Sequence, residues 1–213
     1  MTPHAVLFDL DGTLVDSYRG IVNSLRMTSA EFGVTIPDDD PLRWCIGPSL
    51  WQSFARLLNS DDRTLLDAAV LRYRAIYRDG PMFDYDVYEG VVETLDRLVE
   101  RNIICYVATS KAQIYARDIV ASTPMAGHIR EVYGCELDGT RVDKKELIAW
   151  VMEQEGLSAS TIAMIGDRHH DIDGAHHNGV ASIAVSYGYG SREELAHAGY
   201  LVDHPGQILD LFA

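Results

Sequence analysis

The sequence predicts an α/β fold, a doubly wound parallel sheet with an inserted helical domain, from three observations. Short apolar runs of strand length recur without strict alternation, which is typical of strands buried on both faces of a parallel sheet. Amphipathic helical patterns lie between these runs, as in Rossmann-like sheets covered by crossover helices. One long segment near the N-terminus holds helical patterns and no convincing strand, which indicates an insertion.

The apolar runs with the length and composition of buried strands are Ala5–Leu10, Ile103–Ala108, Thr161–Ile165 and Ala181–Val185. Helical patterns separate them. Residues 90–101 place most of their valines and leucines on one helical face. Residues 142–155 behave similarly and stop before Gly156, a residue type that commonly ends a helix.

The predicted insertion follows the first strand and contains two apolar stripes at helical spacing. The first stripe is Leu50, Phe54, Leu57 and Leu58, and the second is Leu65, Leu66, Ala69, Val70, Tyr73 and Tyr77. We therefore expect a helical domain over residues 17–85, and an α/β core built from residues 1–16 and 86–213. The length of 213 residues suits one large domain that carries a smaller insert.

The charge and cysteine content narrow the expected partners and location. The chain has 18 basic and 32 acidic residues, a formal net charge of -14, which disfavours polymeric nucleic acid and anionic membranes as partners. No apolar stretch approaches the roughly 18–20 residues of a membrane helix, and the start does not resemble a signal peptide. The three cysteines are far apart and odd in number, which argues against a disulfide framework. We expect a cytoplasmic protein, either a monomer or a homodimer.

Two aspartates end the first predicted strand, where ligands of open α/β sheets bind. Asp9 and Asp11 are separated by one residue, so their side chains point to the same side of a strand. Two adjacent carboxylates repel each other unless a cation lies between them, and Mg²⁺ prefers hard oxygen ligands of this kind. Gly12 then permits an unusual turn. A bare Asp-x-Asp-Gly could also be a simple turn that closes a strand.

The longer string Phe8–Ser17, FDLDGTLVDS, resembles motif one of the haloacid dehalogenase superfamily. The resemblance covers nearly the whole chain. It is closest to the subgroup with a helical cap between motifs one and two, which includes phosphoglycolate phosphatases and small bacterial 5′-nucleotidases. It therefore implies a phosphatase that uses Mg²⁺ and acts on a small phosphorylated metabolite.

The run Ile103–Lys111 resembles motif two, in which a hydroxyl at a strand end binds the phosphoryl group. Thr109 matches that position, and Ser110 beside it is a further candidate for substrate binding. Thr109 alone would equally suit the N-cap of a helix that begins near Lys111.

The run from Ile162 to Asp171 resembles motif four, a strand followed by Gly-Asp-x-x-x-Asp. The resemblance implies that Asp167 completes the metal site and that Asp171 supports it or binds the metal directly. Acidic residues before a helix can also serve only to stabilise its N-terminus.

Motif three is usually a lysine, often followed by proline, and this chain departs from that pattern. Lys144 fits best by its distances in sequence to Gly166 and Ile148. Lys145 and Arg141 remain alternatives.

The resemblance also supplies a mechanism. Asp9 would attack phosphorus and form an aspartyl-phosphate, while Asp11 would donate a proton to the leaving oxygen and then accept one from water. Mg²⁺ would be held by Asp9, the main-chain carbonyl of Asp11, and Asp167. Thr109 and Lys144 would bind the other phosphate oxygens.

The expected helical cap offers candidates for substrate contact, of which Arg43 is preferred. The aromatic residues Trp44, Trp51, Tyr73 and Tyr77 could stack on a substrate base, but their spacing suits packing inside the cap equally well. Four histidines, His169, His170, His176 and His177, lie close together in sequence, a pattern more typical of an exposed helix than of a metal site.

Nucleoside 5′-monophosphates are expected ahead of phosphoglycolate as substrates. Residues 46–48, 137–141 and 187–190 resemble the nucleotidase branch, and a cap of about 65–70 residues suits a small enclosed substrate. The alternatives are a sugar-phosphate phosphomutase and a catalytically inactive binding module on the same fold. Such a module would be free to lose Asp9, Asp11, Lys144 or Asp167, and the chain keeps all of them.

Overall fold

The structure is a computed structural model that describes residues 3–38 and 41–212. Residues 1–2, 39–40 and 213, which the expected domain ranges include, lie outside the described residues. The chain divides into two compact units, one formed by residues up to 16 and from 87 onward, and the other by residues 17–86. The second border therefore falls one residue after the border expected from the sequence.

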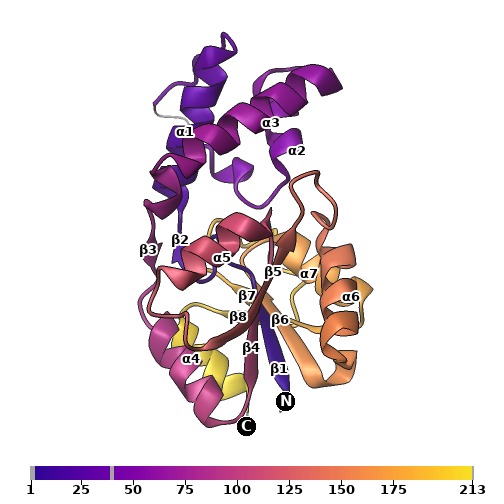
Figure 1. Cartoon of the computed structure of the whole chain (residues 1–213). Coiled ribbons are helices and arrows are strands. Elements are labelled where there is room, and N and C mark those ends of the chain that lie inside the picture. The colour runs from indigo at the N-terminus through magenta and orange to yellow at the C-terminus, as the bar shows by residue number, and fades with distance from the viewer. Residues whose placement is uncertain (1–2, 39–40, 213) are drawn as a thin grey trace. The chain divides into compact units, whose positions relative to one another are not determined.

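The first unit contains a six-stranded parallel sheet in the order β5-β4-β1-β6-β7-β8, seen from the side in Figure 1. The strands are β1 (Ala5–Phe8), β4 (Ile104–Ala112), β5 (Ile129–Cys135), β6 (Ile162–Gly166), β7 (Ala181–Val185) and β8 (Tyr200–Val202). Strand β1 is buried over its whole length and lies between β4 and β6. This sheet confirms the predicted doubly wound α/β fold.

Helices cover both faces of the sheet. On one face α6 (Lys144–Glu155) and α7 (His169–His177) pack against alternate residues of β1, β4 and β6. On the other face α4 (Val91–Glu100) and the 3₁₀ helix η4 (Pro205–Leu211) pack near Phe8. Helix α5 (Gln113–Ala121) contacts β4 and β5, and the short η3 (Ala159–Thr161) precedes β6. Because both faces are covered, the central strands β1 and β6 are buried and carry no polar side chain.

Two strands of the sheet were not predicted. Strand β5 begins with the partly exposed sequence Ile-Arg-Glu, and β8 exposes Tyr200 and Leu201, each to 45%. Edge strands are covered on fewer sides than central ones, so neither shows the continuous apolar run used for prediction. Strand β4 also runs to Ala112, and α5 begins at Gln113, two residues after Lys111, with Ala112 and not Thr109 as its N-cap.

The second unit is helical. It contains α1 (Tyr18–Glu31), η1 (Arg43–Cys45), α2 (Leu50–Leu57), α3 (Arg63–Arg78) and η2 (Pro81–Phe83). Tyr73 and Tyr77 are buried in its core with their rings stacked at 5.4 Å, and Phe54 packs edge-on against Tyr73. The short strands β2 (Val15–Asp16) and β3 (Asp86–Val87) pair with each other where the chain passes between the units.

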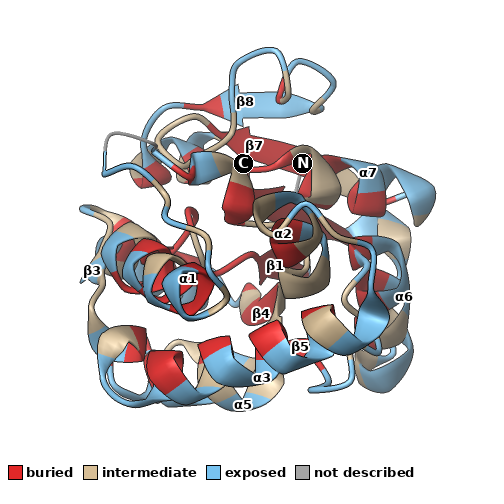
Figure 2. Ribbon diagram, turned by 90° about the horizontal axis from the view of Figure 1, so that it is seen from above, coloured by how far each residue is buried: buried red, intermediate tan, exposed pale blue. Residues whose placement is uncertain are grey.

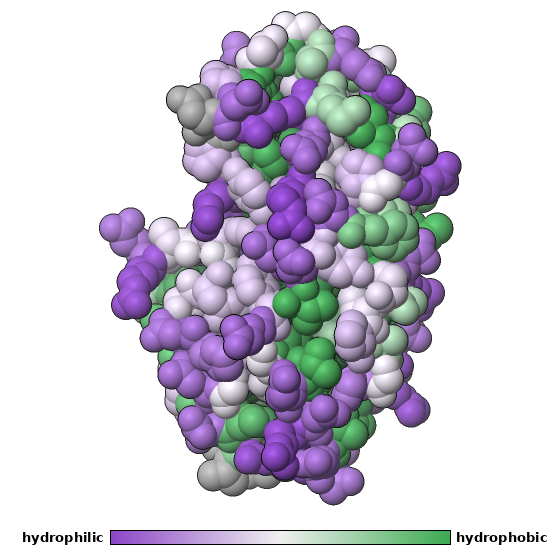
Figure 3. Space-filling view, turned by 90° about the vertical axis from the view of Figure 1, so that its left-hand side faces the viewer, coloured by the Kyte–Doolittle hydropathy of each residue, from purple (hydrophilic) through white to green (hydrophobic). Residues whose placement is uncertain are grey.

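The burial pattern agrees with this layering. Buried residues, red in Figure 2, form the inner strands and the helix faces turned toward them. On the face shown in Figure 3, hydrophilic residues predominate and apolar ones form smaller clusters between them. Among the described residues, no helix has both the length and the apolar character needed to cross a membrane. The three cysteines are buried.

Candidate active site

The turn after β1 is closed by main-chain hydrogen bonds. The N–H of Asp9 donates to the carbonyl of Ile165 at 2.9 Å, which extends the pairing of β1 with β6. The carbonyl of Leu10 accepts from the N–H groups of residues 13, 14 and 15 at 3.0–3.3 Å. Gly12 has a φ of +88°, and a Cβ atom there would lie 2.2 Å from Oδ2 of Asp167. Only glycine lets the turn pass this close to Asp167.

Three buried carboxylates meet at the carboxyl end of the sheet. Asp9 follows β1, Asp167 follows β6, and Asp171 lies in the first turn of α7, and carboxylate oxygens of all three lie within 4.8 Å of one another. Burial raises the pKa of Asp9, Lys144 opposes that rise, and Asp171 adds to it. Burial, followed by repulsion from Asp9 and Asp171, raises the pKa of Asp167 well above its usual range. The cluster thus concentrates negative charge that water does not screen.

Lys144 is the cation within this cluster. Its Nζ lies 2.9 Å from Oδ1 of Asp9 and 2.6 Å from Oδ1 of Asp171, and it donates to the carbonyl of Ala108 at 2.8 Å. Burial lowers the pKa of Lys144, but the charges of Asp171 and Asp9 outweigh it, so the pKa is raised. The ammonium therefore stays charged where it meets both carboxylates.

The two alternatives to Lys144 lie elsewhere. Lys145 is exposed on α6. Arg141 forms an ion pair with Glu136, and its guanidinium lies 4.0 Å from the ring centre of Trp150. Neither of these contacts involves the carboxylate cluster.

A loop after β7 encloses Asp167. The N–H of Tyr189 donates to Oδ2 of Asp167 at 2.7 Å. A Cβ atom on Gly188 would lie 2.4 Å from Cβ of Asp167, and one on Gly190 would lie 2.0 Å from its carbonyl oxygen. Sequence reasoning noted this Tyr-Gly-Tyr-Gly string only as a resemblance. The two glycines, Gly188 and Gly190, follow a buried strand, and glycines in such a place indicate a close approach of the main chain to another group. This pattern was the signal in the sequence for the contact with Asp167.

Asp11 stands apart from the carboxylate cluster and pairs with a different lysine. Both of its carboxylate oxygens accept from Nζ of Lys111, at 3.0 and 2.8 Å. Sequence reasoning gave Lys111 no role, because a helix was expected to begin near it.

The two hydroxyl residues at the end of β4 have different surroundings. Thr109 is buried, and its Oγ1 accepts from the N–H of Lys111 at 3.3 Å. The Ser110 hydroxyl donates to the carbonyl of Val142 at 2.9 Å, which ties the end of β4 to the segment before Lys144.

Glu194 holds the N-terminus of α7. Its Oε1 accepts from Nε of Arg168 at 2.7 Å and from the main-chain N–H of His169 at 3.0 Å, and lies 2.7 Å from Nδ1 of His169. Burial raises the pKa of Glu194, but these hydrogen bonds outweigh it and lower the pKa to about 2.

Burial and nearby positive groups lower the pKa of His170 to about 4.

The candidate residues of the helical unit have neighbours within that unit. Arg43 is exposed, with its guanidinium 6.0 Å from the ring centre of Tyr18. Arg56 lies 3.9 Å from the ring centre of Trp44, and Arg63 and Arg74 lie 5.1 and 5.3 Å from that of Trp51. These guanidinium groups occupy ring surface that a substrate base would need.

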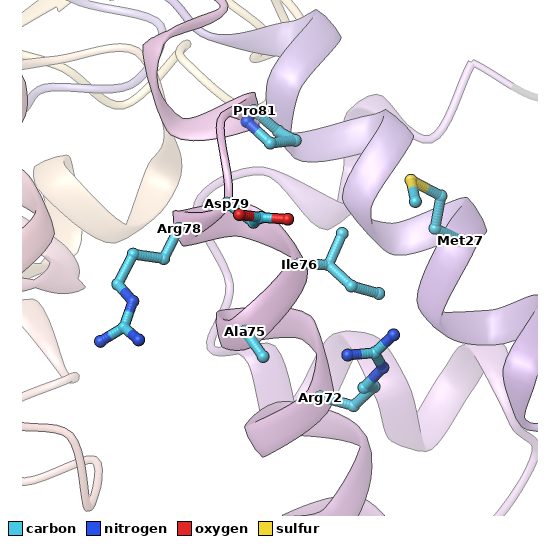
Figure 4. A pocket seen from close by; sticks show the side chains of 7 residues that line it. All are labelled: Met27, Arg72, Ala75, Ile76, Arg78, Asp79 and Pro81. Atoms are coloured by element: carbon cyan, nitrogen blue, oxygen red, sulfur yellow. The ribbon is translucent and has the colours of Figure 1, made fainter.

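A hollow of about 420 Å³ also lies in the helical unit, and Figure 4 shows its lining, Met27, Arg72, Ala75, Ile76, Arg78, Asp79 and Pro81. The Arg72 guanidinium is engaged by Glu31, at 2.5 and 2.6 Å. None of the lining residues belongs to the carboxylate cluster.

The cluster fits a divalent cation of the Mg²⁺ type. When ionised, its three carboxylates and the single ammonium of Lys144 sum to a formal charge of -2. All candidate ligands are oxygens, which hard cations prefer. Burial is the first cause of the raised pKa values of Asp9 and Asp167, and a cation bound beside them would favour their ionised forms.

Comparison with known proteins shows the family of the chain. The family model described as haloacid dehalogenase-like hydrolase matches residues 6–185. The chain belongs to this family. A 5′-nucleotidase from Pseudomonas aeruginosa is 44% identical over 89% of this chain and 86% of its own length. A crystal structure of a predicted phosphatase from Clostridium acetobutylicum has a TM-score of 0.93 and 35% identity, over 99% of this chain and 100% of that one. The chain is a phosphoric monoester hydrolase of the haloacid dehalogenase-like family.

A relative with a different name is also similar. The tyrosine-protein kinase PtkA of Mycobacterium tuberculosis is 32% identical over 89% of this chain, which spans 64% of that protein. The names of both relatives describe enzymes that transfer a phosphoryl group. A nucleotidase transfers it to water, whereas a tyrosine kinase transfers it to a tyrosine hydroxyl.

Proposed function

We propose that the chain is a Mg²⁺-dependent phosphatase that hydrolyses small phosphate monoesters through an aspartyl-phosphate on Asp9. The observation that carries this proposal is the position of Asp9 Oδ1, 2.9 Å from Nζ of Lys144 inside a buried carboxylate cluster. A carboxylate can attack an anionic phosphoryl group only where fixed positive charge offsets their repulsion.

The residues divide the chemistry between them. The Asp9 carboxylate attacks phosphorus, and Lys144 binds the phosphoryl oxygens while it holds Asp9. Mg²⁺, held by Asp9, the main-chain carbonyl of Asp11, and Asp167, would supply further neutralisation of phosphoryl charge, with Asp171 orienting Lys144 beside it. Asp11 gives a proton to the leaving oxygen and later takes one from water.

The end of β4 completes the phosphate site. Thr109 offers a hydroxyl to the phosphoryl group, and Ser110 fixes the segment that leads into Lys144 through its bond to Val142. Residues 17–86 act as the cap that excludes water during transfer, and Arg43 contacts the substrate from this cap.

Nucleoside 5′-monophosphates are the proposed substrates, ahead of phosphoglycolate. The name of the P. aeruginosa relative supports this order. Base stacking on Trp44 or Trp51 is less favoured than the sequence suggested, because arginine side chains already lie against both rings. The small, odd number of cysteines supports a reducing compartment such as the cytoplasm.

A phosphate-release screen tests the proposal. Nucleoside monophosphates, sugar phosphates and phosphoglycolate are offered to metal-stripped protein with added Mg²⁺ or with excess EDTA. We expect release that requires Mg²⁺, with a kcat/KM for some nucleoside monophosphate above that for phosphoglycolate. Undiminished turnover in EDTA refutes the metal requirement, and a kcat/KM at least tenfold higher for phosphoglycolate or a sugar phosphate refutes the substrate order.

Asp9→Asn in the same assay tests the nucleophile. An amide is a very poor nucleophile, so turnover should fall below a tenth of the wild-type rate while the melting temperature shows that the protein is folded. Product analysis separates the alternatives, since a phosphomutase or a kinase passes the phosphoryl group to a hydroxyl and releases little free phosphate.

A further inference from the structure

Lys111 is a second lysine at the carboxyl end of the sheet, and the proposed mechanism leaves it without a role. Its ammonium donates to both carboxylate oxygens of Asp11, and the two side chains are only 8% and 12% exposed. A bidentate contact restricts rotation of a carboxylate about its last bond more than a single hydrogen bond does.

The use of lysine at this position is itself informative. The chain has only three lysines, at positions 111, 144 and 145, and fifteen arginines. Within residues 3–38 and 41–212, lysine forms ion pairs only with the site aspartates Asp9, Asp11 and Asp171. The other ion pairs of these residues use arginine or histidine as the cation. An ammonium is a compact charge that can turn toward several oxygens, whereas guanidinium is a rigid fork.

The main chain of Lys111 lies in an irregular part of β4, between Thr109 and Ala112, which pair with Gly134 and Cys135 of β5. Its N–H donates to Oγ1 of Thr109 at 3.3 Å, and a Cβ atom on Gly134 would lie 2.5 Å from its carbonyl oxygen. The stem of Lys111 therefore starts from a defined point, so the position of its ammonium depends on the end of β4 and not on a loose surface segment.

We propose that Lys111 is a positioning residue that holds the Asp11 carboxylate in place for both proton transfers of the reaction. This inference rests on the proposed function. In the first half, the bond from Asp9 to phosphorus forms, the ester P–O bond breaks, and the proton of Asp11 goes to the leaving oxygen. In the second half, a P–O bond to water forms, the bond from Asp9 to phosphorus breaks, and the proton of water goes to Asp11.

The two halves depend differently on the leaving group. p-Nitrophenolate leaves readily without a proton, whereas phenolate, a stronger base, gains more from one. Displacement of Asp11 should therefore slow transfer from phenyl phosphate more than transfer from p-nitrophenyl phosphate. Hydrolysis of the phosphoenzyme should be slowed equally with both esters, since the same intermediate is formed.

Lys111→Met tests the proposal, with kcat/KM measured for both aryl phosphates. Because general acid–base catalysis contributes typically 10²–10⁴-fold, we expect at least about tenfold more loss for phenyl phosphate. Asp11→Asn should show the same pattern, and adding Lys111→Met to it should cost less than about threefold more. With p-nitrophenyl phosphate, intact mass spectrometry should show more phosphorylated protein for Lys111→Met than for wild type.

Controls separate this role from others. Arg117→Met removes an exposed ion pair with Glu131 nearby in the chain and should leave both rates unchanged. Lys111→Arg keeps the charge and should show the same leaving-group pattern with a smaller loss, which serves if Lys111→Met does not fold. Equal losses for the two esters with a raised KM, or full additivity with Asp11→Asn, would overturn the proposal. If Asp9→Asn retains turnover the proposed function fails, whereas an inactive Asp9→Asn with no leaving-group pattern for Lys111 refutes only this inference.

Discussion

The two lysines near the carboxyl end of β1 show how single residues divide the work of balancing charge. Lys144 lies against Asp9 and Asp171, while Lys111 lies against Asp11. Removing one partner of a buried ion pair leaves the other charge without compensation, which costs more than the loss of a surface pair. Substitutions of Lys144 or Lys111 should therefore lower activity much more than substitutions of their exposed neighbours.

Lys144→Ala and Lys145→Ala form a matched pair for this comparison. Lys144→Ala should lower kcat by roughly 10²–10³-fold or more, the range found when one donor to a transition-state charge is removed. Lys145→Ala should stay within about twofold of wild type, because its side chain is exposed. Steady-state kinetics with p-nitrophenyl phosphate gives the answer, and thermal melting with Mg²⁺ shows whether each variant is folded. The reverse order of effects would move the role to Lys145.

The sequence predicted part of this site and missed another part for a physical reason. Asp9 and Asp167 end strands that are adjacent in the sheet, so strand prediction alone brings them together. The contact of Lys111 with Asp11 depends on β4 continuing to Ala112, and a capping hydroxyl at Thr109 suggested a helix instead. Strand β4 continues to Ala112 because Ala112 pairs with Cys135 of β5. Strand β5 could not be predicted from the sequence, since it lacks a continuous apolar run.

At the scale of elements, the N-terminus of α7 is held by a loop that follows β7. Glu194 accepts from Arg168 and from His169 there, and the carboxylate also complements the positive end of the helix. Because α7 carries Asp171, the anchoring of its first turn fixes one side of the carboxylate cluster.

Glu194→Gln should destabilise the protein in a pH-dependent way. The folded pKa of about 2 lies below the ordinary value of 4.5, so the ionised carboxylate contributes stability that is complete above about pH 4.5 and is lost as pH falls toward 2. Near pH 7 we expect a loss of roughly 1–2 kcal/mol from weaker hydrogen bonds to the neutral amide. Thermal melting at pH 7 and at pH 3.5 should show the gap between wild type and variant narrowing. Glu193→Gln, at an exposed neighbour, is the control; a gap that widens on acidification contradicts the prediction.

At the scale of the whole molecule, the metal-free protein carries a stability cost in its own active site. The raised pKa of Asp167 means that its ionisation is harder in the folded chain than in the unfolded one. This cost is absent below the unfolded value near 3.8 and grows as pH rises toward the folded value. A cation bound only by the folded state offsets it.

Asp167→Asn should therefore raise the melting temperature in EDTA at pH 8, with the two proteins converging near pH 4. The amide oxygen can still accept from the N–H of Tyr189, so the enclosing loop keeps its contact. Added Mg²⁺ should raise the melting temperature of wild type and have much less effect on the variant. Asp173→Asn, at an exposed position on α7, should behave as wild type in both conditions. A variant less stable than wild type in EDTA at pH 8 would show that Asp167 is not a destabilising charge.

The paired strands β2 and β3 have a consequence for how the chain tolerates rearrangement. Since Val15–Asp16 and Asp86–Val87 lie side by side, the ends of the intervening 70-residue unit are already brought together. A tight hairpin of a few residues could join them in its place with little loop-closure entropy to overcome. The helical unit can therefore be shortened or replaced by another sequence between β2 and β3. Such a replacement leaves the strand order of the parallel sheet unchanged.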